Sequence, residues 1–316
     1  MPAPVLVVGD CLLDVTIRPA GPIRRGADAP ASVDLGPGGG AANVAVRLAR
    51  AGAGVRLIAP VATDASGALL TTFLASEGVE LVPLAAARTG AVAILVSGDG
   101  ERTMLSQRAP FPEEAAERLS TEVRDACWVH VSGYALLDAR GAELAAAVAG
   151  RPGDVPLGVA TPPLAGASAA AFRELVAASR QDLLFANAAE ARVLLGGRRG
   201  ASSVPRLAAE LAAELGCATV VTDRDAIAGA LPGQAAPIAI PAARRQAVDS
   251  TGAGDAVASV VTAALLAAGW PPSPGALASA LDHAAALAGE VVAAAGAQTR
   301  VPAERRSVAG SRASQQ

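Results

Sequence analysis

Short apolar runs recur along the chain, and most of them are separated by longer Ala- and Leu-rich segments with helical periodicity. The runs predict strands over 5–8, 55–59, 91–96, 128–131, 157–160, 183–186 and 219–222. The intervening segments predict helices over 42–51, 67–77, 141–149, 170–179 and 204–215. This alternation predicts an α/β fold with a central, mostly parallel sheet covered by helices on both faces. Ligands of such a sheet bind beyond the carboxyl ends of its strands.

Two stretches interrupt the alternation and predict a small β lid. Residues 16–35 are rich in Pro, Gly and Arg, and residues 88–107 contain Ser97-Gly98-Asp99-Gly100, which is typical of a hairpin turn. Together they could form an antiparallel flap over one end of the sheet, although two ordinary surface loops are the simpler alternative. We expect residues 1–302 to form one domain and the polar segment 303–316 to be a disordered tail.

Composition excludes several classes of protein. Hydrophobic residues make up 52% of the 316 residues and the net charge is −3, so a large core is available and no basic surface for nucleic acid is expected. The longest apolar stretch, 256–269, is too short to cross a bilayer, and the first residues lack the basic region of a signal peptide. The cysteines Cys11, Cys127 and Cys217 form no framework, which favours a cytoplasmic location.

The chain has no lysine, and all 26 of its basic residues are arginines. Genomic composition bias is enough to explain this, but the absence has a chemical consequence. Neither a P-loop lysine nor the strand lysine of protein kinases can be present. Any phosphate chemistry must therefore use backbone amides, arginine and metal ions.

The strongest motif is Asp249-Ser250-Thr251-Gly252-Ala253-Gly254-Asp255, which opens an Ala/Val-rich helix. Small residues leave the first N–H groups of a helix open, and these groups bind phosphate with the help of the helix dipole. An aspartate beside them can take a proton from a hydroxyl group that attacks the phosphate. The alternative is a glycine-rich turn in which Asp255 is an ordinary first-turn acid.

A second glycine segment, Gly36-Pro37-Gly38-Gly39-Gly40-Ala41-Ala42-Asn43, precedes the helix predicted over 42–51. Glycines allow a ligand to approach the backbone closely, and Asn43 can offer its amide to a sugar hydroxyl. Two alternatives remain. Asn43 could face solvent after an ordinary loop, or Gly36, Gly38 and Ala41 could belong to a dinucleotide-binding turn.

Acids also follow two of the predicted strands. Asp10 and Asp14 come after the first strand, where paired carboxylates suit polyol recognition, although they could equally cap loops. Asn187 and Glu190 follow the strand over 183–186 and enter a helix. Glu190 could hold a water molecule on Mg²⁺, whereas an N-cap with a first-turn acid is the alternative.

Taken in this order, the motifs resemble the ribokinase-like carbohydrate kinases, the PfkB family, over residues 4–302. The resemblance implies an ATP-dependent kinase whose base is Asp255 and whose anion hole is formed by Gly252, Ala253 and Gly254. The substrate would be held by a further set of positions. They are Asp10, Asp14, Gly38, Gly39, Gly40 and Asn43. The two lid stretches would cover the substrate and could form a homodimer contact.

The resemblance also implies the nucleotide side of the site. Asn187 and Glu190 would serve the ATP phosphates and Mg²⁺, with His283 near the adenine. Asp249, the Thr251 carbonyl and the Gly296 carbonyl would surround a monovalent cation such as K⁺. The family has a Thr-x-Gly-x-x-Gly loop under the nucleotide; here Thr222, Arg224 and Gly229 occupy this region, and Arg224 stands where glycine is usual.

The leading hypothesis is phosphorylation of a hydroxymethyl group on a small sugar or sugar acid of the ribose, fructose or 2-keto-3-deoxygluconate type. A nucleoside kinase of the adenosine or pseudouridine type is the runner-up, with Tyr134 and Phe111 as the aromatic candidates. A non-catalytic sensor with the same fold and an NAD-dependent oxidoreductase are the alternatives from other classes.

Overall fold

The computed structural model describes residues 3–97, 101–165, 167–197, 203–234, 236–242, 252–293, 298, 300 and 301. The body is built on a nine-stranded sheet in the order β13-β12-β11-β10-β9-β8-β1-β4-β5. Its strands are β1 (Val5–Val8), β4 (Val55–Pro60), β5 (Val79–Leu84), β8 (Trp128–Ser132), β9 (Leu157–Ala160), β10 (Leu183–Asn187), β11 (Ala218–Thr222), β12 (Ala226–Ala230) and β13 (Ile238–Pro241).

The sheet is parallel from β5 to β11, whereas β12 and β13 are each antiparallel to their neighbour. Every residue of β1 and β8 is buried, because helices cover both faces of the sheet. Continuous apolar runs are typical of such strands. The predicted α/β fold is confirmed, and each strand predicted from these runs is present.

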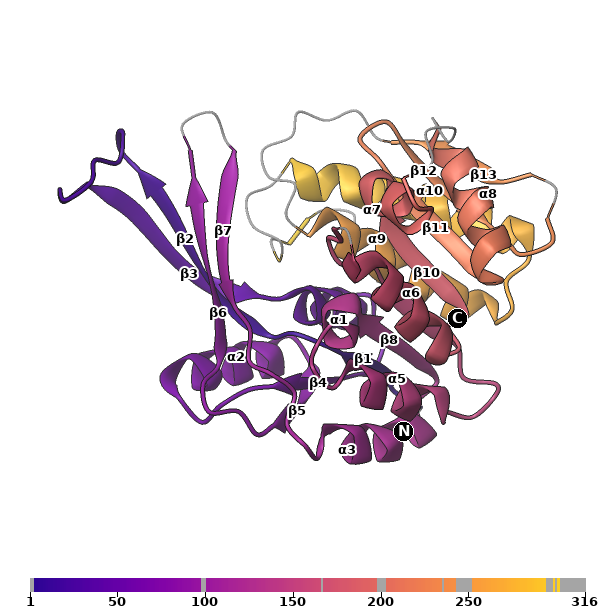
Figure 1. Cartoon of the computed structure of the whole chain (residues 1–316), viewed down its shortest axis with the longest axis horizontal. Helices are drawn as coiled ribbons and strands as arrows, with labels where there is room; N and C mark the ends of the chain where they lie inside the picture. Colours follow the sequence, from indigo (N-terminus) through magenta and orange to yellow (C-terminus); the bar gives the residue numbers. More distant parts are fainter. Residues whose placement is uncertain are drawn as a thin grey trace, which may run out of the picture.

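Helices form one layer on each face of the sheet (Figure 1). One layer contains α1 (Gly40–Arg50), α2 (Ala65–Ser76), α9 (Ala253–Ala268) and α10 (Pro274–Val292). The other contains α3 (Ala115–Glu122), α5 (Gly141–Ala149), α6 (Ala167–Ala178), α7 (Ala188–Leu194) and α8 (Val204–Leu215). The predicted helices are all present, with ends that differ by a few residues. Among the described helices, none is both long and apolar enough to cross a membrane.

A second sheet projects from the body beside α2 (Figure 1). Its order is β3-β2-β6-β7, formed by β2 (Leu12–Pro19), β3 (Ala31–Gly38), β6 (Gly90–Val96) and β7 (Arg102–Gln107). Both irregular stretches of the sequence therefore form paired strands. The expectation of a purely antiparallel flap is wrong, because β2 and β6 are parallel neighbours in register from Leu12 with Gly90 to Ile17 with Leu95.

The parallel pair has a structural reason. Each of the two lid hairpins contributes its first strand to the centre of the lid, and both of these strands run away from the body. The inward-facing side chains of Leu12, Val92 and Ile94 form a small buried cluster of their own. The predicted tail over 303–316 and the turn over 98–100 lie outside the described residues.

Candidate active site

The first acid of the site lies at the carboxyl end of β1. Asp10 follows this strand, and Ser132 ends the parallel neighbour β8, so the sheet places the two side chains side by side. The Ser132 hydroxyl donates a hydrogen bond of 3.1 Å to Oδ1 of buried Asp10. Gly9 between β1 and Asp10 has φ 154°, and a Cβ there would lie 2.5 Å from the Ser132 Cβ. Glycine at this position therefore permits the close approach.

The glycine segment brings the start of α1 against the same strand end. Gly39 has φ 96°, and a Cβ there would lie 2.5 Å from the Asp10 carbonyl oxygen. Gly38 is buried against the carboxylate of Asp14, which lies on β2 of the lid. The next residue, Gly40, opens α1 and borders two acids. A Cβ at this position would lie 3.5 Å from Oδ1 of Asp255 and 3.9 Å from Oδ1 of Asp10.

The start of α9 faces this segment. Gly252 is the N-cap residue, with φ 75°, and Ala253, Gly254 and Asp255 form the first turn. No described side chain caps the helix, and its first backbone hydrogen bond runs from the N–H of Ala256 to the Gly252 carbonyl. The three preceding N–H groups therefore have no acceptor within the helix. They can bind an anion such as a phosphoryl group.

Asn43 connects the two helix starts. This residue lies in the first turn of α1, and its Nδ2 donates a hydrogen bond of 2.8 Å to Oδ2 of Asp255. The side chain is buried, so the alternative in which Asn43 faces solvent is wrong. Oδ1 of Asn43 accepts a 2.8 Å hydrogen bond from Nε2 of Gln298. A residue near the end of the chain thus reaches the site.

Burial raises the pKa of Asp255 to about 6, and the negative charge of Asp10 acts in the same direction. The hydrogen bond from Asn43 and the positive charge of Arg47 lower it. A carboxylate with this pKa is mostly ionised at neutral pH and is still more basic than an exposed aspartate. These properties suit a general base that works near neutral pH.

Asn187 and Glu190 form a reciprocal capping box at the start of α7. Oδ1 of Asn187 accepts from the Glu190 N–H at 2.9 Å, and Oε2 of Glu190 accepts from the Asn187 N–H at 2.8 Å. The capping geometry named as the alternative is therefore present. Glu190 nevertheless shares the electrostatic environment of the site. Burial raises its pKa to about 7, and the charge of Asp255 contributes, against the lowering effect of its hydrogen bonds to Asn187.

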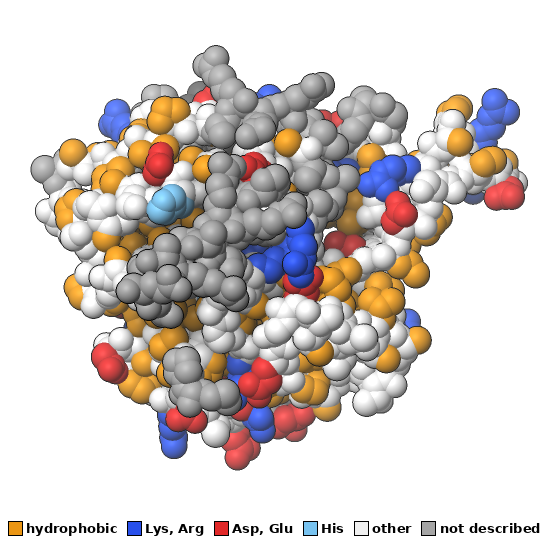
Figure 2. Space-filling view, turned by 180° about the vertical axis from the view of Figure 1, so that it is seen from behind, with side chains coloured by type: hydrophobic (Ala, Val, Ile, Leu, Met, Phe, Trp, Pro, Cys, Tyr) orange, Lys and Arg blue, Asp and Glu red, His pale blue; other side chains and the backbone are white. Residues whose placement is uncertain are grey.

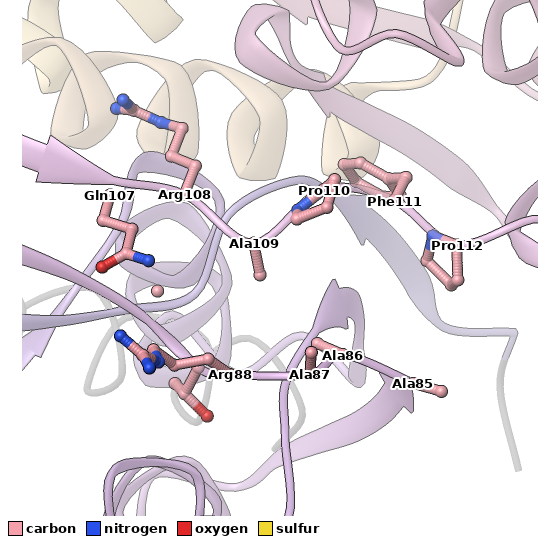
Figure 3. A pocket seen from close by; sticks show the side chains of 12 residues that line it. Ala85, Ala86, Ala87, Arg88, Gln107, Arg108, Ala109, Pro110, Phe111 and Pro112 are labelled. Carbon is pink, nitrogen blue, oxygen red and sulfur yellow. The ribbon is translucent and has the colours of Figure 1, made fainter.

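Arg108 extends the site at the base of the lid. The residue follows β7, its guanidinium lies 3.6 Å from the ring centroid of Tyr134, and its Nε lies 3.7 Å from Oδ2 of Asp10. Residues 85–90 and 107–112 line a cavity of about 360 Å³. Figure 3 shows the Arg108 side chain pointing away from Ala85 and Arg88, which lie on the other wall of this cavity. The guanidinium is therefore directed to the active site and not into this cavity.

The sequence interpretation missed Arg108 and Ser132. Ser132 could have been found, because it follows a predicted strand at the edge where ligands bind. Arg108 had no comparable signal, since the residue is one of 26 arginines in the chain and belongs to no motif.

The predicted nucleotide-binding residues lie at the neighbouring strand ends and on α10. Thr222 ends β11 and pairs in register with Asn187 on β10, and exposed Arg224 follows in the turn to β12. Gly229 lies within β12, where a Cβ would be 3.0 Å from Leu277 on α10. Packing of this helix on the strand therefore requires a small residue at Gly229. His283 is an exposed residue of α10.

The proposed cation ligands Asp249, Thr251 and Gly296 lie outside the described residues. Within the described part of the chain, no group of three His, Cys, Asp or Glu side chains could hold a metal ion. Cys11, Cys127 and Cys217 are free thiols.

The chain is similar in sequence to known carbohydrate kinases. The model of the pfkB family of carbohydrate kinases matches residues 3–304. The bifunctional protein HldE of Halorhodospira halophila is 32% identical over 321 residues, which cover 97% of this chain and 63% of that protein. Fructokinase-1 of Oryza sativa subsp. japonica is 36% identical over 109 residues, which are 34% of this chain and 33% of the rice protein. The chain thus matches less than two thirds of the length of each relative.

Solved structures have the same fold. Ribokinase from Thermotoga maritima superposes with a TM-score of 0.79 at 21% identity, covering 98% of this chain and 99% of the ribokinase. Adenosine kinase from Sinorhizobium meliloti gives a TM-score of 0.76 at 21% identity, covering 98% and 100%. With the family match over nearly its whole length, the chain belongs to the pfkB family of carbohydrate kinases. The predicted family and the ribokinase-like fold are confirmed.

Proposed function

We propose that the protein transfers the γ-phosphoryl group of ATP to a hydroxymethyl group of a small sugar or sugar acid. The acceptor would be of the ribose, fructose or 2-keto-3-deoxygluconate type. The observation that carries the proposal is the position of Asp255 in the first turn of α9, beside open backbone N–H groups and 2.8 Å from Asn43. A base and an anion-binding helix end thus adjoin one another.

Asp10, Asp14 and Asn43 orient the acceptor in this proposal, and Gly38, Gly39 and Gly40 leave room for it. The attacking hydroxyl lies at Oδ1 of Asp255, on the side that Gly40 borders. Asp255 accepts the hydroxyl proton as the new O–P bond forms and the bond to ADP breaks. The N–H groups of Gly252, Ala253 and Gly254 stabilise charge on the transferring group, which is the main source of catalysis in phosphoryl transfer.

The residues present fit Mg²⁺ bound mostly by water and phosphate oxygens. Mg²⁺ keeps several of its waters and commonly takes only one or two carboxylates, and Glu190, in the first turn of α7 after β10, is a carboxylate near Asp255. Glu190 would hold a metal-bound water, and the metal would neutralise charge on the ATP phosphates. Thr222, Arg224, Gly229 and His283 stay proposals for the nucleotide side, and Asp249, Thr251 and Gly296 for a monovalent cation such as K⁺.

Arg108 favours an acceptor that carries a carboxylate. Its guanidinium is fixed from two sides by Tyr134 and Asp10, and a fixed guanidinium matches the planar geometry of a carboxylate. The same contacts weaken the nucleoside alternative. Arg108 already covers the Tyr134 ring, and Phe111 is buried in the main core, so neither ring offers an open platform for a base.

A homodimer through the lid is also part of the proposal. Val33, Leu35 and Leu105 are 58%, 61% and 69% exposed, and the strand register puts them on the same face of the lid as Val15. Figure 2 shows hydrophobic side chains along the projecting lid. Contiguous exposed apolar surface is typical of interaction sites. Light scattering should give twice the chain mass for the wild type and the chain mass for Leu35→Asp.

The test of the kinase function is turnover with an acceptor panel. ADP release and ³¹P NMR of the product would be followed with ATP, Mg²⁺ and each of ribose, fructose, 2-keto-3-deoxygluconate and adenosine. We expect a phosphomonoester from one of the sugars or the sugar acid. Transfer to adenosine alone would favour the nucleoside alternative. Ligand binding without turnover of any acceptor would favour the sensor alternative and contradict the proposal.

A further inference from the structure

Gln298, close to the end of the described chain, contacts the active site through Asn43 of α1. Nε2 of Gln298 donates to Oδ1 of Asn43 at 2.8 Å, and Nδ2 of the same Asn43 amide donates to Asp255 at 2.8 Å. The Asn43 side chain thus connects Gln298 to the acid proposed as the catalytic base.

Gln298, Arg300 and Val301 are held in place by contacts that do not involve the Gln298 side chain. Nη1 of Arg50 donates to the Gln298 carbonyl at 2.9 Å, and Arg50 also forms two 3.0 Å hydrogen bonds with the carboxylate of Glu77. Arg300 donates to Glu77 at 2.9 Å, and Val301 is buried in a cluster that includes Ala256 of α9. A change of the Gln298 side chain should therefore leave this segment in place.

The Asn43 amide is held at both of its ends, by Asp255 and by Gln298. An asparagine amide has one accepting and one donating end of almost the same shape. The carboxylate of Asp255 only accepts hydrogen bonds, so it faces the Asn43 NH₂ group, and the NH₂ group of Gln298 donates to the Asn43 oxygen at the other end. The reverse orientation would put the Asn43 oxygen against the carboxylate, where two acceptors repel each other.

We propose that Gln298 is a positioning residue that orients the Asn43 amide and, through it, the carboxylate of Asp255. The proposal rests on the role of Asp255 in the proposed function, but its structural claim does not require turnover. With Asn43 bound to Oδ2, the other oxygen, Oδ1, is the one that borders Gly40 and receives the acceptor. By holding the Asn43 oxygen, Gln298 helps to keep Oδ2 in its hydrogen bond and leaves Oδ1 for the acceptor.

The other charged groups that act on Asp255 belong to different elements. Asp10 follows β1, Arg47 lies on α1, and Glu190 lies on α7. None of these residues is changed by a substitution at Gln298. An altered Asp255 titration in a Gln298 variant would therefore report on the Asn43 contact.

Two substitutions test the proposal. Gln298→Met keeps the length of the side chain and removes the donor, while Gln298→Glu replaces the donor with an acceptor and favours the reversed Asn43 orientation. Because the Asn43 hydrogen bond lowers the pKa of Asp255, its weakening should raise the midpoint of the Asp255 titration. We expect a rise of about one pH unit in Gln298→Glu and a smaller rise in Gln298→Met.

The measurement is the ¹³C shift of the Asp255 carboxyl group as a function of pH, assigned with Asp255→Asn. Arg300→Ala is the matched control, because it loosens the same segment and leaves the Gln298 side chain unchanged. Its Asp255 midpoint should equal that of the wild type. The thermal midpoint of each variant should confirm that it is folded.

Turnover gives a second readout in the same variants. We expect kcat of Gln298→Met to fall about 3- to 10-fold while the KM for ATP stays unchanged, since only the base is misplaced. An Asp255 midpoint that stays at the wild-type value in both folded Gln298 variants would overturn the proposal. If the wild type transfers no phosphate but the midpoint shifts as expected, the proposed function fails and the positioning role stands.

Discussion

The proposed acceptor side and the proposed nucleotide side of the site are built differently. On the acceptor side, Asp10, Asn43 and Asp255 are each held by a hydrogen bond to a residue from another part of the chain. On the nucleotide side, Arg224 and His283 are exposed. We therefore expect the acceptor side to be formed before ligands bind, and the nucleotide side to gain its contacts from ATP. Fixed polar groups of this kind favour catalysis because they need little rearrangement during the reaction.

The largest effect should come from Asp255→Asn. This variant keeps the shape of the side chain and removes the proton acceptor, so kcat should fall by about 10²- to 10⁴-fold. Coupled ADP release with the accepted sugar measures the change. Asp282→Asn, an exposed acid on α10, is the control and should retain wild-type turnover. An Asp255→Asn variant with more than a tenth of the wild-type kcat would contradict the assignment of the base.

Gly40→Ala should separate acceptor binding from folding. The added methyl group would be at ordinary contact distance, 3.5 Å from Asp255 and 3.9 Å from Asp10, so the backbone can accommodate it. The methyl group would occupy the space proposed for the acceptor. We expect the KM for the acceptor to rise about 10-fold or more, with an unchanged KM for ATP and equal or higher thermal stability.

The control for this variant is Gly275→Ala, in the first turn of α10, where a Cβ would lie 3.9 Å from Ser273 Oγ. Its KM values should match those of the wild type. If Gly40→Ala raises the KM for ATP and leaves that of the acceptor unchanged, the two sides of the site have been assigned in reverse.

Thermal stability should show the cost of the buried base. The pKa of Asp255 is raised from an ordinary value of 3.8 to about 6, so the folded state disfavours ionisation. Stability is therefore lost as pH rises from about 4 to about 6, and it stays lost at higher pH. Asp255→Asn should melt several degrees above the wild type at pH 8, and the difference should vanish near pH 4. Equal melting temperatures throughout would show that Asp255 titrates as an exposed acid.

The smallest effect should come from Arg224→Ala on the nucleotide side. The exposed guanidinium is screened by solvent and salt, so its loss should raise the KM for ATP by about 2- to 3-fold. The KM for the acceptor should not change. Arg206→Ala, on the exposed surface of α8, is the matched control. A tenfold rise in the KM for ATP would show that Arg224 contacts the nucleotide directly.

The placement of the residues proposed for the acceptor side was largely predictable from the sequence. Asp10, the glycines before α1, Asn43 and Asp255 all stand at the ends of strands or the starts of helices, and the parallel sheet brings such ends to one edge. Ser132 follows the same rule. Gln298 could not be assigned a role in this way, because its contact with Asn43 joins residues that are 255 positions apart in the sequence.

Other features could not be read from local patterns. The parallel pairing of β2 with β6 depends on how two separate hairpins meet, which neither hairpin encodes alone. Gly229 looked like a loop glycine, yet it belongs to β12 and packs against α10. A single glycine has no periodicity that would distinguish these environments. The role of Glu190 could not be read from its motif either. The same residue completes a capping box and is an acid whose pKa is affected by Asp255.

The most direct test of the central claim is the pH dependence of kcat in the wild type and in Asp255→Asn. If Asp255 is the base, its ionised form is required, and the wild-type kcat should fall about tenfold per pH unit below a midpoint of about 6. The residual rate of Asp255→Asn should not follow this acidic limb. An acidic limb with the same midpoint in both proteins would contradict the claim that Asp255 is the catalytic base.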